Sequence, residues 1–312
     1  MNKIEEVNYL NFLYCFDSNF LNQAFSSIIS LLDNIDELIN IFIIYNRPAA
    51  NLLVPKIIKE HKNLNNFYVL TFQESGIYFP NLENNHISEA TYYRLFIEKY
   101  LKNDLKFIFY LDADTICLKN ISSLVRNLQN KLENSDYIIA AKTEKYISDE
   151  DSDVFKRLNL NSKYFNAGVM AINLSKWKDK NVTELLLERL ELLGESIVYW
   201  DQDVLNSFFN GNYLELDEVL NYDSSNQNIL GSGAAILHYI GSKKPWYMSG
   251  IFENGSQYYH NNYSKFNNQK YHIVHIWKKS SLYDFLIGIL KLKIFKISFP
   301  FEFIKIFFKT LK

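Results

Sequence analysis

Short apolar runs alternate with helix-like patterns along the first third of the chain. We expect buried strands at 11–16, 38–45, 67–72 and 106–111, where mostly apolar runs are bounded by polar and turn residues. Helices are expected at 21–32, at 51–61 and after Ser88, whose hydroxyl can cap a helix running to Tyr100. Strands that alternate with helices predict an α/β fold: a mainly parallel sheet with helices on both faces.

The pattern is less regular in the second half, but it still predicts strands and helices. We expect strands at 137–141, 168–173 and 234–239, and helices at 182–193 and 201–209. There is no internal repeat, no low-complexity linker and no clear boundary before the last segment. The sequence therefore predicts one domain at 1–275, followed by a tail at 276–312.

The tail mixes Phe, Ile and Leu with lysine at short intervals. Residues 278–312 hold eight Lys against Asp284 and Glu302, a balance of +6, so the preceding body carries −8 of the total of −2. A basic, apolar stretch is typical of a segment that lies on an anionic membrane surface. Pro300 should divide it into two pieces. The alternative is a C-terminal helix packed on the body.

Composition excludes several classes of protein. A chain of 312 residues with 48% hydrophobic and 22% charged residues is globular and large enough to fold without disulfides. Both cysteines, Cys15 and Cys117, lie inside apolar runs, which favours a reducing compartment. The small net charge argues against a nucleic-acid binder. Residues 1–10 do not resemble a secretory signal, and no run of 18 apolar residues predicts a transmembrane helix.

An acidic pair, Asp112-x-Asp114, follows the strand expected at 106–111. Ligands of parallel sheets gather at the carboxyl ends of strands. Two carboxylates there can converge on a divalent cation, which could neutralise a diphosphate leaving group. A solvated turn is the alternative. Leu111–Thr115 also resembles the nucleophile motif of haloacid-dehalogenase-type phosphatases, but the Gly-Asp motif of that family is missing, since none of the ten glycines precedes an Asp.

Three further segments share the order and spacing of a known family. They are Tyr164–Gly168 with Asn173 and Trp177, Trp200–Asn206, and His238–Trp246. Together with Asp17, Asn19, the segment His86–Arg94 and the acidic pair, they resemble retaining glycosyltransferases of family 8. The resemblance covers residues 11 to 250 and is strongest to the lipooligosaccharide and lipopolysaccharide galactosyl- and glucosyltransferases of Gram-negative bacteria.

This resemblance implies a GT-A type nucleotide-sugar-binding domain and a set of site residues. Asp112, Asp114 and His238 would hold Mn²⁺, with Mg²⁺ as the alternative. The donor would be UDP-galactose or UDP-glucose, and the acceptor a lipid-linked glycan at the cytoplasmic face of the inner membrane. The residues implied for the donor and its nucleotide are Cys15, Asp17, Asn19, Arg94, Asp112, Ala113, Asn166, Ala167, Gly241 and Lys244. His86 and Tyr199 match acceptor positions, and Asp201 and Gln202 catalytic ones.

Gln202 lies where the family would place a nucleophile. A neutral amide oxygen is a poor nucleophile, so we expect same-face attack, with Gln202 and Asp201 stabilising a positively charged sugar ring. A protein that binds nucleotide sugars without catalysis is the alternative for the whole chain.

Several site residues have simpler explanations. His238 could be a structural histidine, Arg94 could pair with Glu98 one helical turn later, and Asp201 could cap a helix.

The chain also departs from the family. Phe16 precedes Asp17, and Cys15 stands where a small Ala is usual, which would tighten the uracil pocket. Glu144 stands where galactosyltransferases have Asp near the sugar, and Ile240 occupies an acceptor-side position that is not always apolar. The departures at Glu144 and Ile240 bear on which sugar is transferred and on which acceptor is used.

Overall fold

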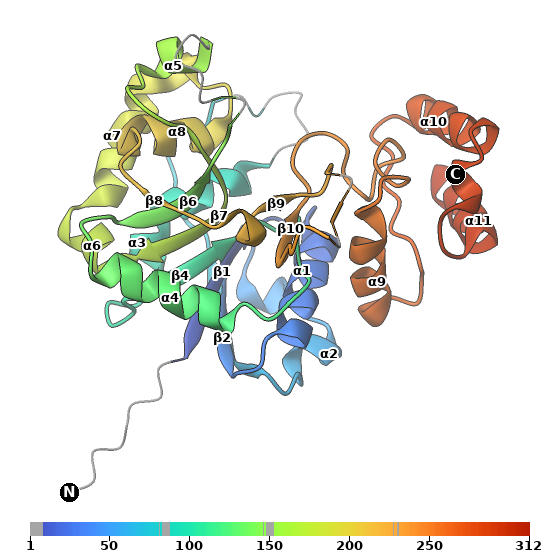
Figure 1. Ribbon diagram of the computed structural model, residues 1–312, viewed down its shortest axis with the longest axis horizontal. Helices are drawn as coiled ribbons and strands as arrows, with labels where there is room; N and C mark the ends of the chain where they lie inside the picture. Colours follow the sequence, from blue (N-terminus) through green and yellow to red (C-terminus); the bar gives the residue numbers. More distant parts are fainter. Residues whose placement is uncertain are drawn as a thin grey trace, which may run out of the picture.

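A seven-stranded sheet forms the centre of the computed structural model, which describes residues 9–80, 82, 88–145, 147, 153–226, 228–229 and 231–312 (Figure 1). Its strand order is β3-β2-β1-β4-β7-β6-β8. The strands are β1 (Leu10–Phe16), β2 (Ile39–Tyr45), β3 (Leu64–Thr71), β4 (Phe107–Leu111), β6 (Ile139–Thr143), β7 (Phe165–Asn173) and β8 (Leu214–Glu215).

The predicted mainly parallel sheet is confirmed. β1 pairs in parallel with β2 and β4, and β2 with β3. β7 is the exception, because it runs antiparallel to both β4 and β6. Every residue of β7 is buried, as expected for a central strand covered on both faces.

Helices cover both faces of the sheet. Phe12, Tyr14 and Phe16 point into a core shared with α1 and α4, whereas Leu13 and Cys15 point into a second core on the opposite face. The helices of the body are α1 (Leu21–Asn34), α2 (Lys56–Lys59), α3 (Ile97–Tyr100), α4 (Ser122–Glu133), α5 (Asp153–Leu158), α6 (Leu174–Asp179), α7 (Val182–Leu193) and α8 (Trp200–Phe209).

A second, three-stranded sheet carries a histidine back toward the acidic turn. Its order is β5-β10-β9, with β5 at Thr115–Cys117, β9 at Tyr222–Asp223 and β10 at Ile236–His238. β10 runs antiparallel to β5 and pairs His238 with Thr115. His238 therefore lies beside Asp114, although the two are far apart in sequence.

Two helix predictions differ from the structure. The helix predicted at 51–61 is wrong, because only α2 forms there, after Pro55 and a 3₁₀ turn at Ala49–Asn51. Proline has no N–H and disfavours helical geometry in the residue before it, so the helix cannot extend back through Pro55. After Ser88, whose hydroxyl accepts from Ala90 N as predicted, the backbone first forms a 3₁₀ helix, η2 (Glu89–Phe96), before α3.

The C-terminal residues form a helical lobe beside α9 (Ser256–Phe266), at one side of the sheet (Figure 1). It consists of α10 (Lys278–Leu290), a 3₁₀ turn η5 (Lys293–Phe295) and α11 (Pro300–Leu311). Pro300 divides the segment as predicted and occupies the first position of α11. The inner faces of α10 and α11 meet through stacked Phe285 and Phe307 rings, 4.1 Å apart. Among the described residues, none of the helices has the length and hydropathy needed to span a bilayer.

Candidate active site

The acidic turn between β4 and β5 is held by the backbone of both sheets. Asp112 N donates to Gly168 O on β7 at 2.8 Å, and Tyr239 N, just after β10, donates to Asp114 O at 3.0 Å. The Thr115 hydroxyl donates to Asp112 O at 2.8 Å. These bonds fix the backbone of the turn, so its two carboxylates project from a rigid base.

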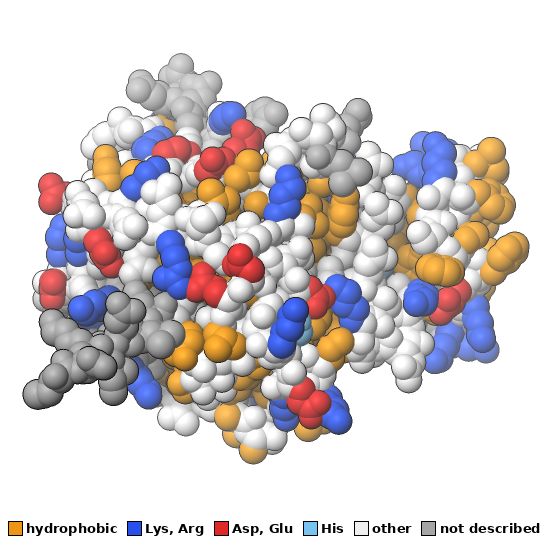
Figure 2. All heavy atoms as spheres, turned by 60° about the horizontal axis from the view of Figure 1, so that its bottom comes forward, with side chains coloured by type: hydrophobic (Ala, Val, Ile, Leu, Met, Phe, Trp, Pro, Cys, Tyr) orange, Lys and Arg blue, Asp and Glu red, His pale blue; other side chains and the backbone are white. Residues whose placement is uncertain are grey.

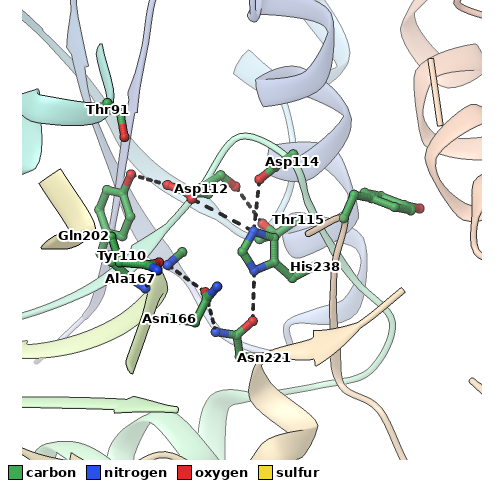
Figure 3. Close-up of polar contacts among 12 residues, drawn as sticks. Thr91, Tyr110, Asp112, Asp114, Thr115, Asn166, Ala167, Gln202, Asn221 and His238 are labelled. Carbon is green, nitrogen blue, oxygen red and sulfur yellow. Dashed lines mark hydrogen bonds and ion pairs between the residues drawn. The ribbon is translucent and has the colours of Figure 1, made fainter. Parts of the chain in front are cut away.

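Asp112, Asp114 and His238 converge as predicted (Figure 3). His238 Nε2 lies 3.3 Å from Asp114 Oδ1 and 4.0 Å from Asp112 Oδ2. The ligand atoms of the three residues all lie within 4.8 Å of one another. Asp114 Oδ1 is buried and has no hydrogen-bond donor within the described chain. Two carboxylates and an imidazole suit a divalent cation such as Mn²⁺, which would satisfy that oxygen, so the residues fit a metal.

A chain of side-chain amides sets the orientation of the His238 ring. Asn166 Nδ2 donates to Glu144 Oε1 at 2.8 Å, and Asn166 Oδ1 accepts from Asn221 Nδ2 at 3.0 Å. Asn221 Oδ1 then lies 2.9 Å from His238 Nδ1 (Figure 3). A carboxylate only accepts, and so does the carbonyl oxygen of an amide. Glu144 therefore fixes the direction of every bond in the chain.

The direction of this chain determines the tautomer of His238. Nδ1 must carry a proton, because it faces an oxygen. In the neutral ring the lone pair is therefore on Nε2, where it is available to a metal. Gly168 N also donates to Asn166 Oδ1, at 3.0 Å, which supports the same orientation of the Asn166 amide. Hydrogen bonds of this kind orient metal-binding histidines and raise their basicity.

Asn221→Ala is expected to weaken Mn²⁺ binding by about 10- to 100-fold, the usual effect of removing the partner of a metal-binding histidine. The variant leaves the His238 ring free to rotate or to change tautomer. The measurement is a calorimetric titration with Mn²⁺. Asn226→Ala, an exposed asparagine outside the chain of amides, is the matched control and should bind as the wild type does. Equal affinity in both variants would remove Asn221 from the metal site.

Arg94 connects the acidic turn to α8. Its Nε and Nη2 donate to Asp201, while Nη1 donates to Asp112 Oδ1 at 3.0 Å and to Ala167 O at 2.7 Å. The guanidinium is only 4% exposed and lies 4.7 Å from the centre of the Tyr110 ring. Burial alone would lower the pKa of Arg94, but Asp112 and Asp201 outweigh it and raise that pKa well above the usual range. Arg94 is therefore a permanent buried cation.

Two simpler explanations from the sequence are wrong. Arg94 forms ion pairs with Asp112 and Asp201 rather than with Glu98. Asp201 does not cap a helix, because Tyr199 is the N-cap of α8 and the Asp201 side chain binds Arg94 and the Thr91 hydroxyl instead.

Lys244 also contacts the acidic turn. Its Nζ donates to Asp114 Oδ2 at 2.6 Å and to Tyr239 O. Burial alone would raise the pKa of the Asp114 carboxyl, but the Lys244 ammonium counteracts burial and helps to hold that pKa below its usual value. Asp114 is therefore ionised at neutral pH, as a metal ligand must be. Gly241, three residues earlier, has a φ of +76° and open space where a side chain would lie, so the backbone is accessible there.

The side chain of Gln202, at the start of α8, is held by a residue of β7 and by the residue that precedes β7. Its Oε1 accepts from Ala167 N at 3.0 Å, and its Nε2 donates to the Tyr164 hydroxyl at 3.1 Å. That hydroxyl donates to Asp203 Oδ1 at 2.8 Å, and the other Asp203 oxygen accepts from Tyr199 N at 2.9 Å. The carboxamide of Gln202 is thus held at the edge of the site next to Asn166 and Ala167.

The strand ends that were predicted to bind nucleotide border one cavity. Cys15 at the end of β1 and Asp112, Ala113 and Asp114 after β4 line a cavity of about 90 Å³. Burial raises the pKa of the Cys15 thiol, so it stays protonated at neutral pH. Two residues after Cys15, Asp17 accepts from Asn19 N at 2.8 Å and forms a tight turn.

The two residues implied for the acceptor differ in what the structure describes. Tyr199 is 39% exposed at the start of α8, whereas His86 lies outside the described residues.

Some residues of the site were not found from the sequence. Tyr110 donates to Asp112 Oδ1, and its place two residues before Asp112 could have indicated this, because alternate residues of a strand share a face. Asn221, the partner of His238, gave no such signal. Tyr164 belongs to a segment that the family resemblance singled out, but nothing in the sequence indicated its hydrogen bond with Gln202. Their roles depend on chain segments that only the fold brings together.

Comparison with known proteins relates most of the chain to one family. The family described as glycosyl transferase family 8 matches residues 11–250. General stress protein A of Bacillus subtilis is 25% identical over 83% of this chain and 95% of its own length. The lipopolysaccharide 1,3-galactosyltransferase of Salmonella typhimurium is 32% identical, and the 1,2-glucosyltransferase of Escherichia coli K12 is 31% identical, each over little more than half of both chains.

A solved structure shows the same fold. The crystal structure of the galactosyltransferase LgtC with donor and acceptor sugar analogues superposes with a TM-score of 0.70, at 22% identity, over 83% of this chain and 96% of that one.

Proposed function

The chain belongs to glycosyl transferase family 8 and is a glycosyltransferase, and we propose that it transfers galactose or glucose from a UDP-sugar to a hydroxyl of a lipopolysaccharide-type glycan, with retention of configuration. One observation supports the metal dependence of this reaction above all others. It is the convergence of Asp112, Asp114 and His238 around a buried carboxylate oxygen that lacks a donor.

The acidic turn and Lys244 would serve the diphosphate. A divalent cation bound by Asp112, Asp114 and His238 supplies Lewis-acid stabilisation of the departing UDP. Lys244 already contacts Asp114 at 2.6 Å, so its ammonium lies at the same edge of the site and adds a fixed positive charge near the phosphates. Cys15, Asp17 and Asn19, at the adjacent end of β1, would hold the nucleoside.

Arg94, Asp201 and Asn166 would bind the donor sugar. Arg94 and Asp201 hold each other in place through two hydrogen bonds, so neither side chain has to be ordered when the sugar binds. Asn166 touches Glu144 on one side and, through Asn221, His238 on the other. The extra methylene of Glu144 would change the shape of the sugar pocket, where such a difference is worth about 1–3 kcal/mol between substrates.

Gln202→Ala is expected to lower kcat by about a hundredfold, on the scale of losing one preorganised electrostatic contact in a transition state. We attribute to Gln202 the stabilisation of the positively charged sugar ring during same-face attack. The measurement is kcat under saturating donor. The control is Gln129→Ala on α4, a partly buried glutamine whose side chain hydrogen-bonds to Glu133 on the same helix. Turnover close to that of the wild type would contradict this role.

The tail would hold the enzyme on the membrane that carries its acceptor. Trp277, Leu290 and Phe301 are 75%, 77% and 82% exposed. Figure 2 shows such hydrophobic side chains next to lysines on the C-terminal lobe, at the right of the view. Apolar side chains that insert among lipids, surrounded by lysines that meet anionic headgroups, form an interfacial surface. We propose this surface as the site of peripheral attachment to the inner leaflet of the inner membrane.

Leu290→Ser with Phe301→Ser should weaken binding to anionic vesicles by about a hundredfold, because each side chain would otherwise bury apolar area in the lipid. Both side chains are exposed, so the fold should be unaffected. The measurement is cosedimentation with phosphatidylglycerol vesicles. Leu53→Ser with Leu192→Ser, which removes two equally exposed leucines from the body, is the matched control. Equal losses in the two variants would contradict attachment through the tail.

A donor screen tests the proposed reaction. UDP-hexoses are offered with Mn²⁺ and a lipopolysaccharide-type acceptor, and the anomeric configuration of the product is read by NMR. We expect one UDP-hexose to give a product with the configuration of the donor. An inverted product would contradict retention. Turnover of phosphomonoesters but of no UDP-sugar would favour the phosphatase alternative based on Asp112.

A further inference from the structure

A cavity of about 420 Å³ lies between α9 and the segment that links α10 to α11, away from the acidic turn. One wall is a polar stripe of α9. Ser256, His260 and Ser264 follow one another at four-residue spacing, which places them on one face of the helix. Residues 296–299 form the opposite wall. The cavity is therefore built by the body and the C-terminal lobe together.

The charge available to a ligand in this cavity is positive. Lys270 and Lys296 line it, and neither forms an ion pair with any residue that the structure describes. Glu253 is the acidic residue of the lining, and its carboxylate lies 3.6 Å from the ammonium of Lys243. Burial lowers the pKa of His260 to about 3, so the ring is neutral. Two lysines that form no ion pair within the described chain therefore line one cavity.

Ser256 provides an unused donor at the same place. The side chain is only 2% exposed, and its hydroxyl has no hydrogen-bond partner among the residues that the structure describes. A buried hydroxyl without a partner costs about 1–3 kcal/mol, so such a group is expected to be satisfied by a water molecule or a ligand. A hydroxyl and two ammonium groups all donate hydrogen bonds, and the group that they suit is a phosphate.

The location of the cavity indicates what carries that phosphate. Phe299, also in its lining, is 57% exposed, and Lys270 Nζ lies 5.4 Å from the centre of its ring. Phe295 nearby in the chain is also well exposed. We propose that the cavity binds the phosphate of an anionic lipid headgroup, with Phe295 and Phe299 among the acyl chains. This inference rests on the proposed membrane attachment and assigns it a specific headgroup site.

Two pairs of substitutions in the full-length chain separate a headgroup site from simple surface charge. Lys270→Gln with Lys296→Gln removes both lysines of the cavity. Lys305→Gln with Lys309→Gln removes two lysines of α11 that do not line it. Binding is measured on phosphatidylcholine vesicles with and without phosphatidylglycerol. The control pair should lose on the order of 30-fold, the effect of two charges near an anionic surface, and the cavity pair at least about tenfold more, because hydrogen bonds to the phosphate are lost as well.

Soluble glycerol phosphate tests the cavity without a membrane. It should bind the wild type and the control pair in ligand-observed NMR, but not the cavity pair. Ser256→Ala should weaken this binding by about tenfold while leaving the melting temperature unchanged or raised, because the substitution removes a buried hydroxyl that has no partner. If Ser256 had only a structural role, Ser256→Ala would not weaken the binding of glycerol phosphate while leaving the melting temperature unchanged or raised.

Each other outcome overturns a distinct claim. Equal vesicle losses for the two pairs, with no binding of glycerol phosphate, would overturn the headgroup site and leave the membrane attachment standing. Wild-type protein that ignores anionic vesicles but binds glycerol phosphate through Lys270 and Lys296 would overturn the lipid as the source and leave a site for free phosphate esters.

Discussion

Gly168→Ala is expected to reduce the affinity for Mn²⁺ by at least about a hundredfold, with UDP-sugar turnover falling in parallel. A Cβ at this position would lie 2.2 Å from His238 Cε1, 2.8 Å from His238 Nε2 and 2.9 Å from Asp112 Oδ2. All three distances are below van der Waals contact. Because Gly168 is on the central strand β7 and receives the backbone bond of Asp112, the strand cannot retreat, and the two ligands must move instead.

The measurement is a Mn²⁺ titration of the folded variant, with circular dichroism to show that the sheet is intact. Gly255→Ala is a suitable control, because the three atoms nearest to its added Cβ are side-chain carbons at 3.3 Å, none of which belongs to Asp112, Asp114 or His238. It should bind Mn²⁺ as the wild type does. If Gly168→Ala also bound Mn²⁺ with unchanged affinity, His238 and Asp112 would not be ligands of the same ion.

Arg94→Met should lower the free energy of unfolding by about 3–5 kcal/mol, because it leaves buried Asp201 without its cation. Asp201 is only 1% exposed. Apart from Arg94, the donor to the Asp201 carboxylate among the described residues is the Thr91 hydroxyl. The flexible, apolar Met fills much of the volume, so the loss measures the unpaired charge rather than a cavity.

Urea unfolding of Arg94→Met and of Arg126→Met makes the comparison direct. Arg126 pairs with Glu37 on the surface, where both side chains are partly exposed, and such pairs contribute about 0–1 kcal/mol. The second substitution should therefore cost far less. A double variant, Arg94→Met with Asp201→Leu, should recover part of the stability, since it removes the buried charge as well. Equal losses for the two single variants would show that Arg94 is not a buried ion-pair residue.

Local patterns were sufficient to predict the sheet and the acidic turn. The strands expected at 11–16 and 106–111 were found at Leu10–Phe16 and Phe107–Leu111. These apolar runs are shorter than a typical helix and are bounded by polar and turn residues, which favours a strand. The position of Asp112 and Asp114 at a strand end follows from the same run. His238 came only from the family resemblance, since its place beside Asp114 depends on the pairing of β10 with β5.

Non-local contacts explain what could not be predicted. Asn221, which hydrogen-bonds to His238, directly precedes β9. That strand has only two residues, too few to show a pattern of apolar and polar positions in the sequence. Sequence spacing could not identify the ion-pair partner of Arg94. Glu98 lies four residues later, the spacing of an ion pair on an α-helix, but the actual partner is the distant Asp201. The four-residue spacing of α-helical ion pairs did not apply, because the backbone around Arg94 is a 3₁₀ helix rather than an α-helix.

The most direct test of the central claim is the rate of UDP release from the preferred UDP-hexose in the presence of acceptor, measured with Mn²⁺ and with EDTA for the wild type and Asp114→Asn. Asp114 carries the buried oxygen that lacks a donor, and the substitution keeps its size while removing its charge. We predict rapid release for the wild type with Mn²⁺, and release at or near background for the wild type in EDTA and for Asp114→Asn under both conditions. Equal rates with Mn²⁺ and EDTA, or an Asp114→Asn variant as fast as the wild type, would contradict a metal-dependent glycosyltransferase site at Asp112, Asp114 and His238.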